Sequence, residues 1–170
     1  MQYAQTTLKT YSSVNDVKPS GKVLPTTGFE VLKLDGDKAQ VKLIGWNKGK
    51  MARMLYFSKG ERIISGAFSK KAKFDSNVLK TEKIGKNTWS KVTLITWIEN
   101  KNLTSDIDAL FSKANNLLET NCGLCHAVHP TKEFSANQWP SVIKAMIPRT
   151  SLSKEDGWLV TQYVQKHAKK

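Results

Sequence analysis

Hydrophobic and polar residues alternate along much of the chain between residues 29 and 98, with the period of a β-strand. The first two alternating segments flank Asp35-Gly36-Asp37-Lys38, and a glycine-containing turn of this kind predicts a β-hairpin. A second hairpin turns at residues 58–61. Five short strands predict a small β-barrel, because closure removes the exposed sheet edges. The predicted strands are 29–34, 39–44, 52–57, 62–68 and 91–98.

Two segments beside these strands lack the alternation. Residues 1–28 are polar and broken by Pro19 and Pro25, so we expect an extended arm. Residues 69–88 are rich in lysine, which predicts a solvated loop, with a docking surface as the less common alternative. The lysines of this segment are Lys70, Lys71, Lys73, Lys80, Lys83 and Lys86.

After residue 104 the hydrophobic period becomes helical. Apolar residues at three-and-four spacing predict one buried helix face, and Asp106 and Asp108 suit the positive end of that helix dipole. The residues of the predicted face are Ile107, Leu110, Phe111, Ala114, Leu117 and Leu118.

Two shorter helices are expected further on. The first covers residues 138–146, with Ser135 or Asn137 as the N-cap; Pro140 favours Asn137, since the proline would then lie in the first turn. The last helix begins at Ser153, whose hydroxyl can accept a hydrogen bond from a main-chain N–H one turn later.

Charge divides the chain in the same way as periodicity. The net charge is +13, and residues 1–104 contain 19 Lys and Arg against 8 Asp and Glu, a net of +11. Residues 105–170 contain 8 against 6, a net of +2. We therefore expect an α+β protein of two domains, a basic β domain at 29–104 after the arm and an all-α domain at 105–170. No apolar run approaches the roughly 18 residues that span a membrane, so no stable membrane anchor is expected.

The only two cysteines form the motif Cys122-Gly123-Leu124-Cys125-His126. Two thiols at this spacing can each add to one vinyl group of a porphyrin, and the following imidazole is then held under the iron as its proximal ligand. The motif predicts one covalently bound haem c, with Cys122 and Cys125 binding the cofactor and His126 binding the metal.

Three other interpretations of the cysteines remain open. A thioredoxin-like redox pair should open a helix, whereas this pair closes one. A zinc site could recruit Cys122, Cys125, His126 and His129, although zinc ligands usually come as two pairs a dozen or more residues apart. The pair could also be a structural disulfide or two ordinary thiols.

The order helix, haem motif, short helix, methionine, helix resembles the small class I cytochromes c. Those proteins commonly place the distal methionine before the C-terminal helix and near a proline, and Met146-Ile147-Pro148 matches this pattern. The resemblance implies that Met146 is the distal metal ligand. A neutral thioether favours ferrous iron and raises the reduction potential. A methionine that only fills a gap in the core is the alternative, and His129, His167, a lysine or an open site are rival solutions.

Three further side chains are candidates for contact with the cofactor. We expect Trp139 and Tyr163 to be core aromatics that pack against the porphyrin. Arg149 can pair with a haem propionate, although a solvated arginine is an equal alternative.

A more specific resemblance covers roughly residues 25–170. Segments 125–130 and 133–140, Met146 and the C-terminal segment 163–169 are similar to the C-terminal mono-haem part of the pentahaem cytochromes that feed trimethylamine-N-oxide reductases. The upstream residues are similar to the SH3-like β segment of that family, and they include Gly45-Trp46, Arg53, Tyr56, Lys59-Gly60 and Arg62-Ile63. The four N-terminal haem motifs and the anchor of the family have no counterpart in this sequence.

This resemblance implies an electron-transfer protein rather than an enzyme. It implies a periplasmic carrier that takes electrons from a quinol-linked donor and delivers them to a molybdenum-containing N- or S-oxide reductase. Residues 1–10 show no signal pattern, so we expect a mature form whose leader has been removed. The alternatives are a haem-based sensor or small-ligand binder, and a basic module for nucleic acid, which we do not expect because no ordered basic and aromatic motif is present.

Overall fold

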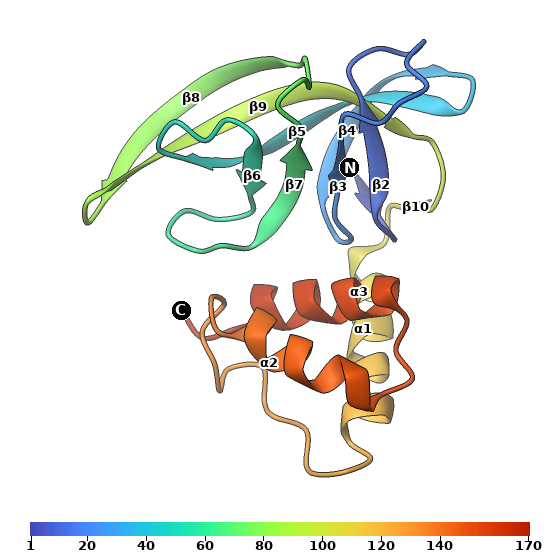
Figure 1. Ribbon diagram of the computed structural model, residues 1–170, viewed down its shortest axis with the longest axis vertical. Coiled ribbons are helices and arrows are strands. Elements are labelled where there is room, and N and C mark those ends of the chain that lie inside the picture. Colours follow the sequence, from blue (N-terminus) through green and yellow to red (C-terminus); the bar gives the residue numbers. More distant parts are fainter. The chain divides into compact units, whose positions relative to one another are not determined.

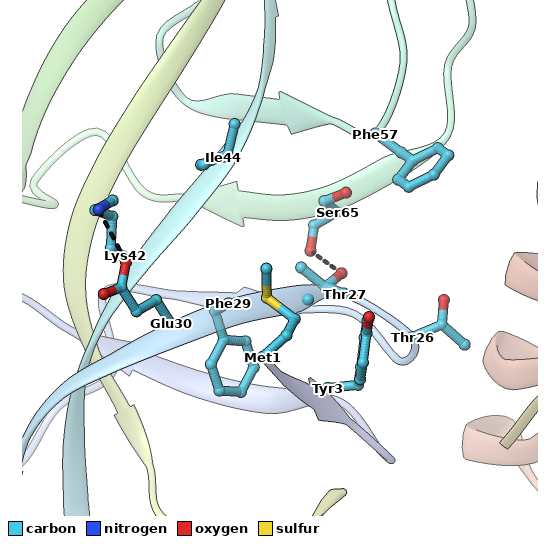
Figure 2. A pocket seen from close by; sticks show the side chains of 11 residues that line it. Met1, Tyr3, Thr26, Thr27, Phe29, Glu30, Lys42, Ile44, Phe57 and Ser65 are labelled. Carbon is cyan, nitrogen blue, oxygen red and sulfur yellow. Dashed lines mark hydrogen bonds and ion pairs between the residues drawn. The ribbon is translucent and has the colours of Figure 1, made fainter. Parts of the chain in front are cut away.

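The computed structural model describes residues 1–170 and divides them into two units, Met1–Ser105 and Asp106–Lys170. Strands make up the first unit and helices the second (Figure 1). The prediction of an α+β protein with a β-barrel followed by helices is confirmed.

Six antiparallel strands close the barrel in the order β5-β6-β7-β3-β2-β9, and β9 returns to pair with β5 along the whole of β5. Strands β4, β1 and β10 extend the sheet from β5, and β8 extends it from β9. The bounds are β1 Gln2–Ala4, β2 Leu8–Tyr11, β3 Gly21–Val23, β4 Gly28–Asp35, β5 Lys38–Lys48, β6 Met54–Tyr56, β7 Ile64–Phe68, β8 Asp75–Ile84, β9 Asn87–Glu99 and β10 Leu103–Thr104.

The predicted first hairpin is confirmed as β4 and β5, closed by the pair Asp35 and Lys38. Gly36 has φ +56°, a left-handed conformation that glycine adopts without steric cost. Alternate residues of β5 and β9 point into the barrel and are buried there, which is the alternation that the sequence shows. This core includes Ala39, Val41, Leu43, Val92, Leu94 and Ile98.

The prediction of an extended arm at residues 1–28 was wrong. This segment contributes β1, β2 and β3, and the side chains of Ala4, Leu8 and Val23 are fully buried in the barrel core. Strands of three or four residues are too short to show a period, so the sequence contained no alternation to detect.

The prediction of a loop at residues 69–88 was also wrong over most of its length. Strand β8 covers Asp75–Ile84 and pairs with β9 from Asp75 opposite Ile95 to Ile84 opposite Asn87. Nearly all of its residues are exposed, so main-chain pairing rather than burial holds it, and its side chains carry no apolar alternation.

The second unit contains the three helices that periodicity predicts. They are α1 Ile107–Cys122, α2 Trp139–Met146 and α3 Lys154–Lys166, with a short 3-10 turn, η1 Ile147–Arg149, after α2. Asp106 caps α1 by accepting from the N–H of Ala109, and Ser153 caps α3 by accepting from the N–H of Asp156.

The predicted caps of α2 were wrong. Gln138 occupies the N-cap position, and its side chain makes no capping hydrogen bond to α2. Ser135 instead donates its own N–H and hydroxyl to the side-chain oxygen of Gln138, at 2.9 Å each. The main-chain oxygen of Ser135 accepts from the N–H groups of Gln138 and Trp139, so a turn precedes the helix.

Replacing Gly45 tests the closure of the barrel between β5 and β6. A Cβ atom at this position would lie 2.7 Å from Leu55 Cγ and 2.7 Å from the main-chain oxygen of Tyr56. We expect Gly45→Ala to lower the free energy of unfolding by about 1–3 kcal/mol, because overpacking shifts neighbouring groups. Urea unfolding followed by circular dichroism measures this, with Gln40→Ala on the same strand as the control. Equal stability of the two variants would contradict the tight crossing.

Candidate functional site

The cysteine motif lies at the C-terminal end of α1. Cys122 is the last residue of the helix and is buried, and the N–H of Gly123 donates to the main-chain oxygen of Glu119 at 3.1 Å. Burial raises the pKa of the Cys122 thiol. The negative end of a helix dipole also disfavours a thiolate, so this position does not suit the thioredoxin-like interpretation.

Three candidate ligand residues, each from a different segment, line one small cavity. Cys122 comes from α1, His126 from the connection after it, and Met146 from the end of α2. The cavity has a volume of about 20 Å³, and its other walls are largely apolar. The remaining lining residues are Leu118, Val128, His129, Trp139, Val142 and Ile143.

The imidazole of His126 is oriented by the main chain. Its Nδ1 lies 2.7 Å from the carbonyl oxygen of Ala127. A carbonyl only accepts, so Nδ1 carries the proton in this hydrogen bond, and in the neutral ring the lone pair is then on Nε2. In metal-binding histidines, a hydrogen bond from the ring nitrogen that does not bind the metal fixes the tautomer and the orientation of the ring. His126 is therefore prepared to bind iron through Nε2.

His129 and His167 occupy different places. His129 lines the same cavity as His126, and its Nδ1 lies 2.9 Å from the Glu133 carboxylate. The Nδ1 of His167 lies 2.8 Å from the main-chain oxygen of Tyr163, and its ring packs against Phe111 at 4.8 Å between centroids. His167 borders a separate hollow between α1 and α3.

Of the other residues predicted to contact the cofactor, only Trp139 lines the cavity. Trp139 is 1% exposed, lines the cavity, and donates its Nε1–H to the main-chain oxygen of Thr131 at 2.9 Å. Tyr163 borders the hollow of His167 instead, and its hydroxyl donates to Asn115 at 3.0 Å. Arg149 is exposed on η1 and does not line the cavity. Cys125 is exposed and does not line the cavity.

The apolar residues that line the cysteine cavity were not among the site residues predicted from the sequence. Leu118, Val142 and Ile143 occupy inward positions of the predicted helices, so the three-and-four spacing could have identified them. Val128 lies in the connection between α1 and α2, where no period marks an inward position.

The chemistry of these residues fits a haem. Two thiols, an oriented imidazole and a thioether are the groups that attach and ligate haem c, and an apolar lining suits a porphyrin ring. The cavity is smaller than a porphyrin, so the side chains around it must give way when the ring binds. A zinc site is not favoured, because no group of three or more His, Cys, Asp or Glu side chains is arranged to hold a metal ion. No helix is long and apolar enough to cross a membrane.

Comparison with known proteins relates the chain to one group of cytochromes. The family model described as the TorC third cytochrome c domain matches residues 1–103, which is the barrel unit without the cysteine motif. The cytochrome c-type protein TorC of Escherichia coli strain K12 is 30% identical over 161 residues, 93% of this chain and 41% of its own length. The cytochrome c-type protein TorY of Haemophilus influenzae is 29% identical over 159 residues, 92% of this chain and 43% of its own length.

These alignments cover more than nine tenths of the chain and so include both units. The chain spans about two fifths of the length of these relatives. No solved structure matches the chain.

The two thiols should differ in reactivity before haem is attached. Cys125 is exposed, whereas Cys122 is buried with a raised pKa, so iodoacetamide should modify Cys125 faster in the haem-free protein. Peptide mass spectrometry over a time course measures both rates. The urea-unfolded chain is the control and should show nearly equal rates. Faster modification of Cys122 in the folded protein would contradict its placement.

Proposed function

We propose that this chain, which belongs to the family of the TorC third cytochrome c domain, carries single electrons as a mono-haem c-type cytochrome. The observation that carries the proposal is that Cys122, His126 and Met146 line one cavity. The relatives that cover both units support it, because each is named as a cytochrome c-type protein.

The motif and Met146 would together attach the haem and bind its iron. The Cys122 and Cys125 thiols would hold the haem covalently, and Nε2 of His126 would bind the iron. The bound haem would supply one-electron exchange between ferric and ferrous iron. Met146 would be the second protein ligand of the metal, and its neutral thioether would raise the reduction potential relative to a second histidine. The apolar cavity walls would limit water at the metal.

The barrel unit would guide an electron-transfer partner. Its surplus of positive charge attracts an acidic protein and speeds the encounter. We propose a molybdenum-containing N- or S-oxide reductase, of the trimethylamine-N-oxide type, as the acceptor and a quinol-linked protein as the donor, in the periplasm. The names TorC and TorY of the relatives and the resemblance of residues 25–170 support this choice.

Replacing Met146 tests the distal ligand. In the haem-containing protein, Met146→Ala should abolish the weak long-wavelength ferric absorption band of an iron–sulfur bond. The reduction potential should fall by on the order of 0.1 V, within the range of roughly 0.8 V that axial ligands cover. Optical redox titration measures both, and Met51→Ala, at an exposed methionine of the barrel unit, is the matched control.

His129→Ala separates the rival ligand from Met146, since His129 lines the same cavity. It should leave the ferric band in place. If the wild type lacks this band, and His129→Ala changes its ferric spectrum while Met146→Ala does not, His129 binds the iron. If the wild-type ferrous protein binds carbon monoxide readily, the sixth position is open and the haem-based sensor replaces the carrier.

Salt should slow electron delivery if the barrel charge guides the partner. Stopped-flow reduction of a trimethylamine-N-oxide reductase by the ferrous protein should slow several-fold from about 0.01 M to about 0.15 M ionic strength, because the Debye length falls from about 30 Å to about 8 Å. Reversing Lys70, Lys71 and Lys73 to glutamate should reduce this dependence, whereas Lys113→Glu on α1 should not. A rate that is independent of salt would contradict electrostatic guidance.

A further inference from the structure

A third hollow in the helical unit lies on a different face of α2 from the cysteine cavity. It has a volume of about 500 Å³ and is lined mainly by apolar atoms. Pro140 and Lys144 contribute from α2, whereas Trp139, Ile143 and Met146 of the same helix face the cysteine cavity. The size lies in the range of pockets that bind small molecules, and the haem residues do not use it. The full lining is Pro140, Lys144, Ile147, Lys154, Gly157, Trp158 and Thr161.

Close packing of α3 against η1 shapes the floor of this hollow. A Cβ atom on Gly157 would lie 2.7 Å from Cδ1 of Ile147, so any other residue at this position would displace the Ile147 side chain or α3. The hydroxyl of Thr161 donates its proton to the main-chain oxygen of Gly157 at 2.7 Å, so this proton is not available to a ligand. Trp158 is half-buried and leaves part of its indole available. The floor therefore offers mainly apolar contacts to a ligand.

The charged groups of the hollow have one sign. Lys144 and Lys154 are its only charged lining residues, they come from different helices, and both are exposed. Neither takes part in any of the ion pairs of the structure. The hollow between α1 and α3 contains Asp108 and Glu119 instead. A ligand for the lysine-lined hollow must therefore combine an apolar body with an anionic head.

We propose that this hollow binds an amphipathic carboxylate whose hydrocarbon part lies on Trp158, Ile147 and Pro140 and whose carboxylate pairs with Lys144 and Lys154. Burial of a hydrocarbon chain supplies affinity at the floor, and two ammonium groups select an anion over a cation at the rim. The cysteine cavity and this hollow have no lining residue in common, so the two proposals are tested separately.

Calorimetric titration of the mature haem-containing protein with decanoate, kept below its critical micelle concentration, tests the proposal. We expect one site in the wild type. The double variant Lys144→Glu/Lys154→Glu should weaken binding by about tenfold or more, since two attractive pairs become repulsive. Trp158→Ala, which keeps both lysines, should also weaken it. Lys113→Glu/Lys132→Glu, at exposed lysines outside the hollow, is the matched control and should bind as the wild type does.

Two probes separate the head from the chain. Acetate, which has the same head without the chain, and decyltrimethylammonium, which has the chain with a cationic head, should not bind. In the ferrous protein, the indole N–H resonance of Trp158 should shift with decanoate and should not shift with acetate. Absence of decanoate binding to the wild type, equal affinity in the Lys144→Glu/Lys154→Glu variant, or equal binding of the cationic amphiphile would each overturn the proposal.

Discussion

The buried stripe of α1 leads directly into the first thiol of the motif, and the arrangement of the helical unit depends on this continuity. Leu110, Ala114, Leu118 and Cys122 follow one another at intervals of four residues, and all are buried. Residues at this spacing lie on one helix face, so packing of that face fixes the direction in which Cys122 points. The helix then ends at Gly123, and His126 follows within one short connection. The contacts that stabilise the helix therefore place the first thiol, and the connection after Gly123 carries the imidazole.

In the proposed electron carrier, the two units would have separate tasks. The helical unit holds every donor group of the candidate haem site, and it is nearly neutral in net charge. The barrel unit has no cysteine or histidine and carries most of the positive charge. Chemistry at the iron depends on short-range orientation, whereas partner encounter depends on a field that acts over about a Debye length. Because the charged surface and the candidate metal ligands lie in different units, the surface charge can change without disturbing the ligands.

Periodicity predicted the long elements of this fold and missed the short ones for a physical reason. The hairpin of β4 and β5 and the helices α1, α2 and α3 each contain enough residues to repeat a pattern. Strands β1 to β3 have three or four residues each, and β8 is exposed along nearly its whole length, so neither bears a readable period. Strands β1, β2 and β3 are held by main-chain pairing with β10, β9 and β7, which lie far along the chain, whereas β8 pairs with the next strand, β9.

The candidate site shows the same limit. The spacing of Cys122, Cys125 and His126 indicates its chemistry from sequence alone, because the covalent attachment is local. Which other side chains reach the cavity depends on how α1, α2 and α3 pack. The structure brings Met146, Trp139 and His129 to it, and places Tyr163 and His167 at a separate hollow. Tyr163 has helical spacing like any core residue, so its sequence position could not show which cavity it faces.

Covalent attachment of one haem is the central claim, and intact-mass spectrometry of the protein produced with a cytochrome c maturation system tests it most directly. The account predicts one haem per chain that survives extraction with acidified acetone, and a proteolytic peptide containing Cys122 and Cys125 that carries the added mass. A haem that extracts completely, or a chain with the mass of the polypeptide alone, would contradict it.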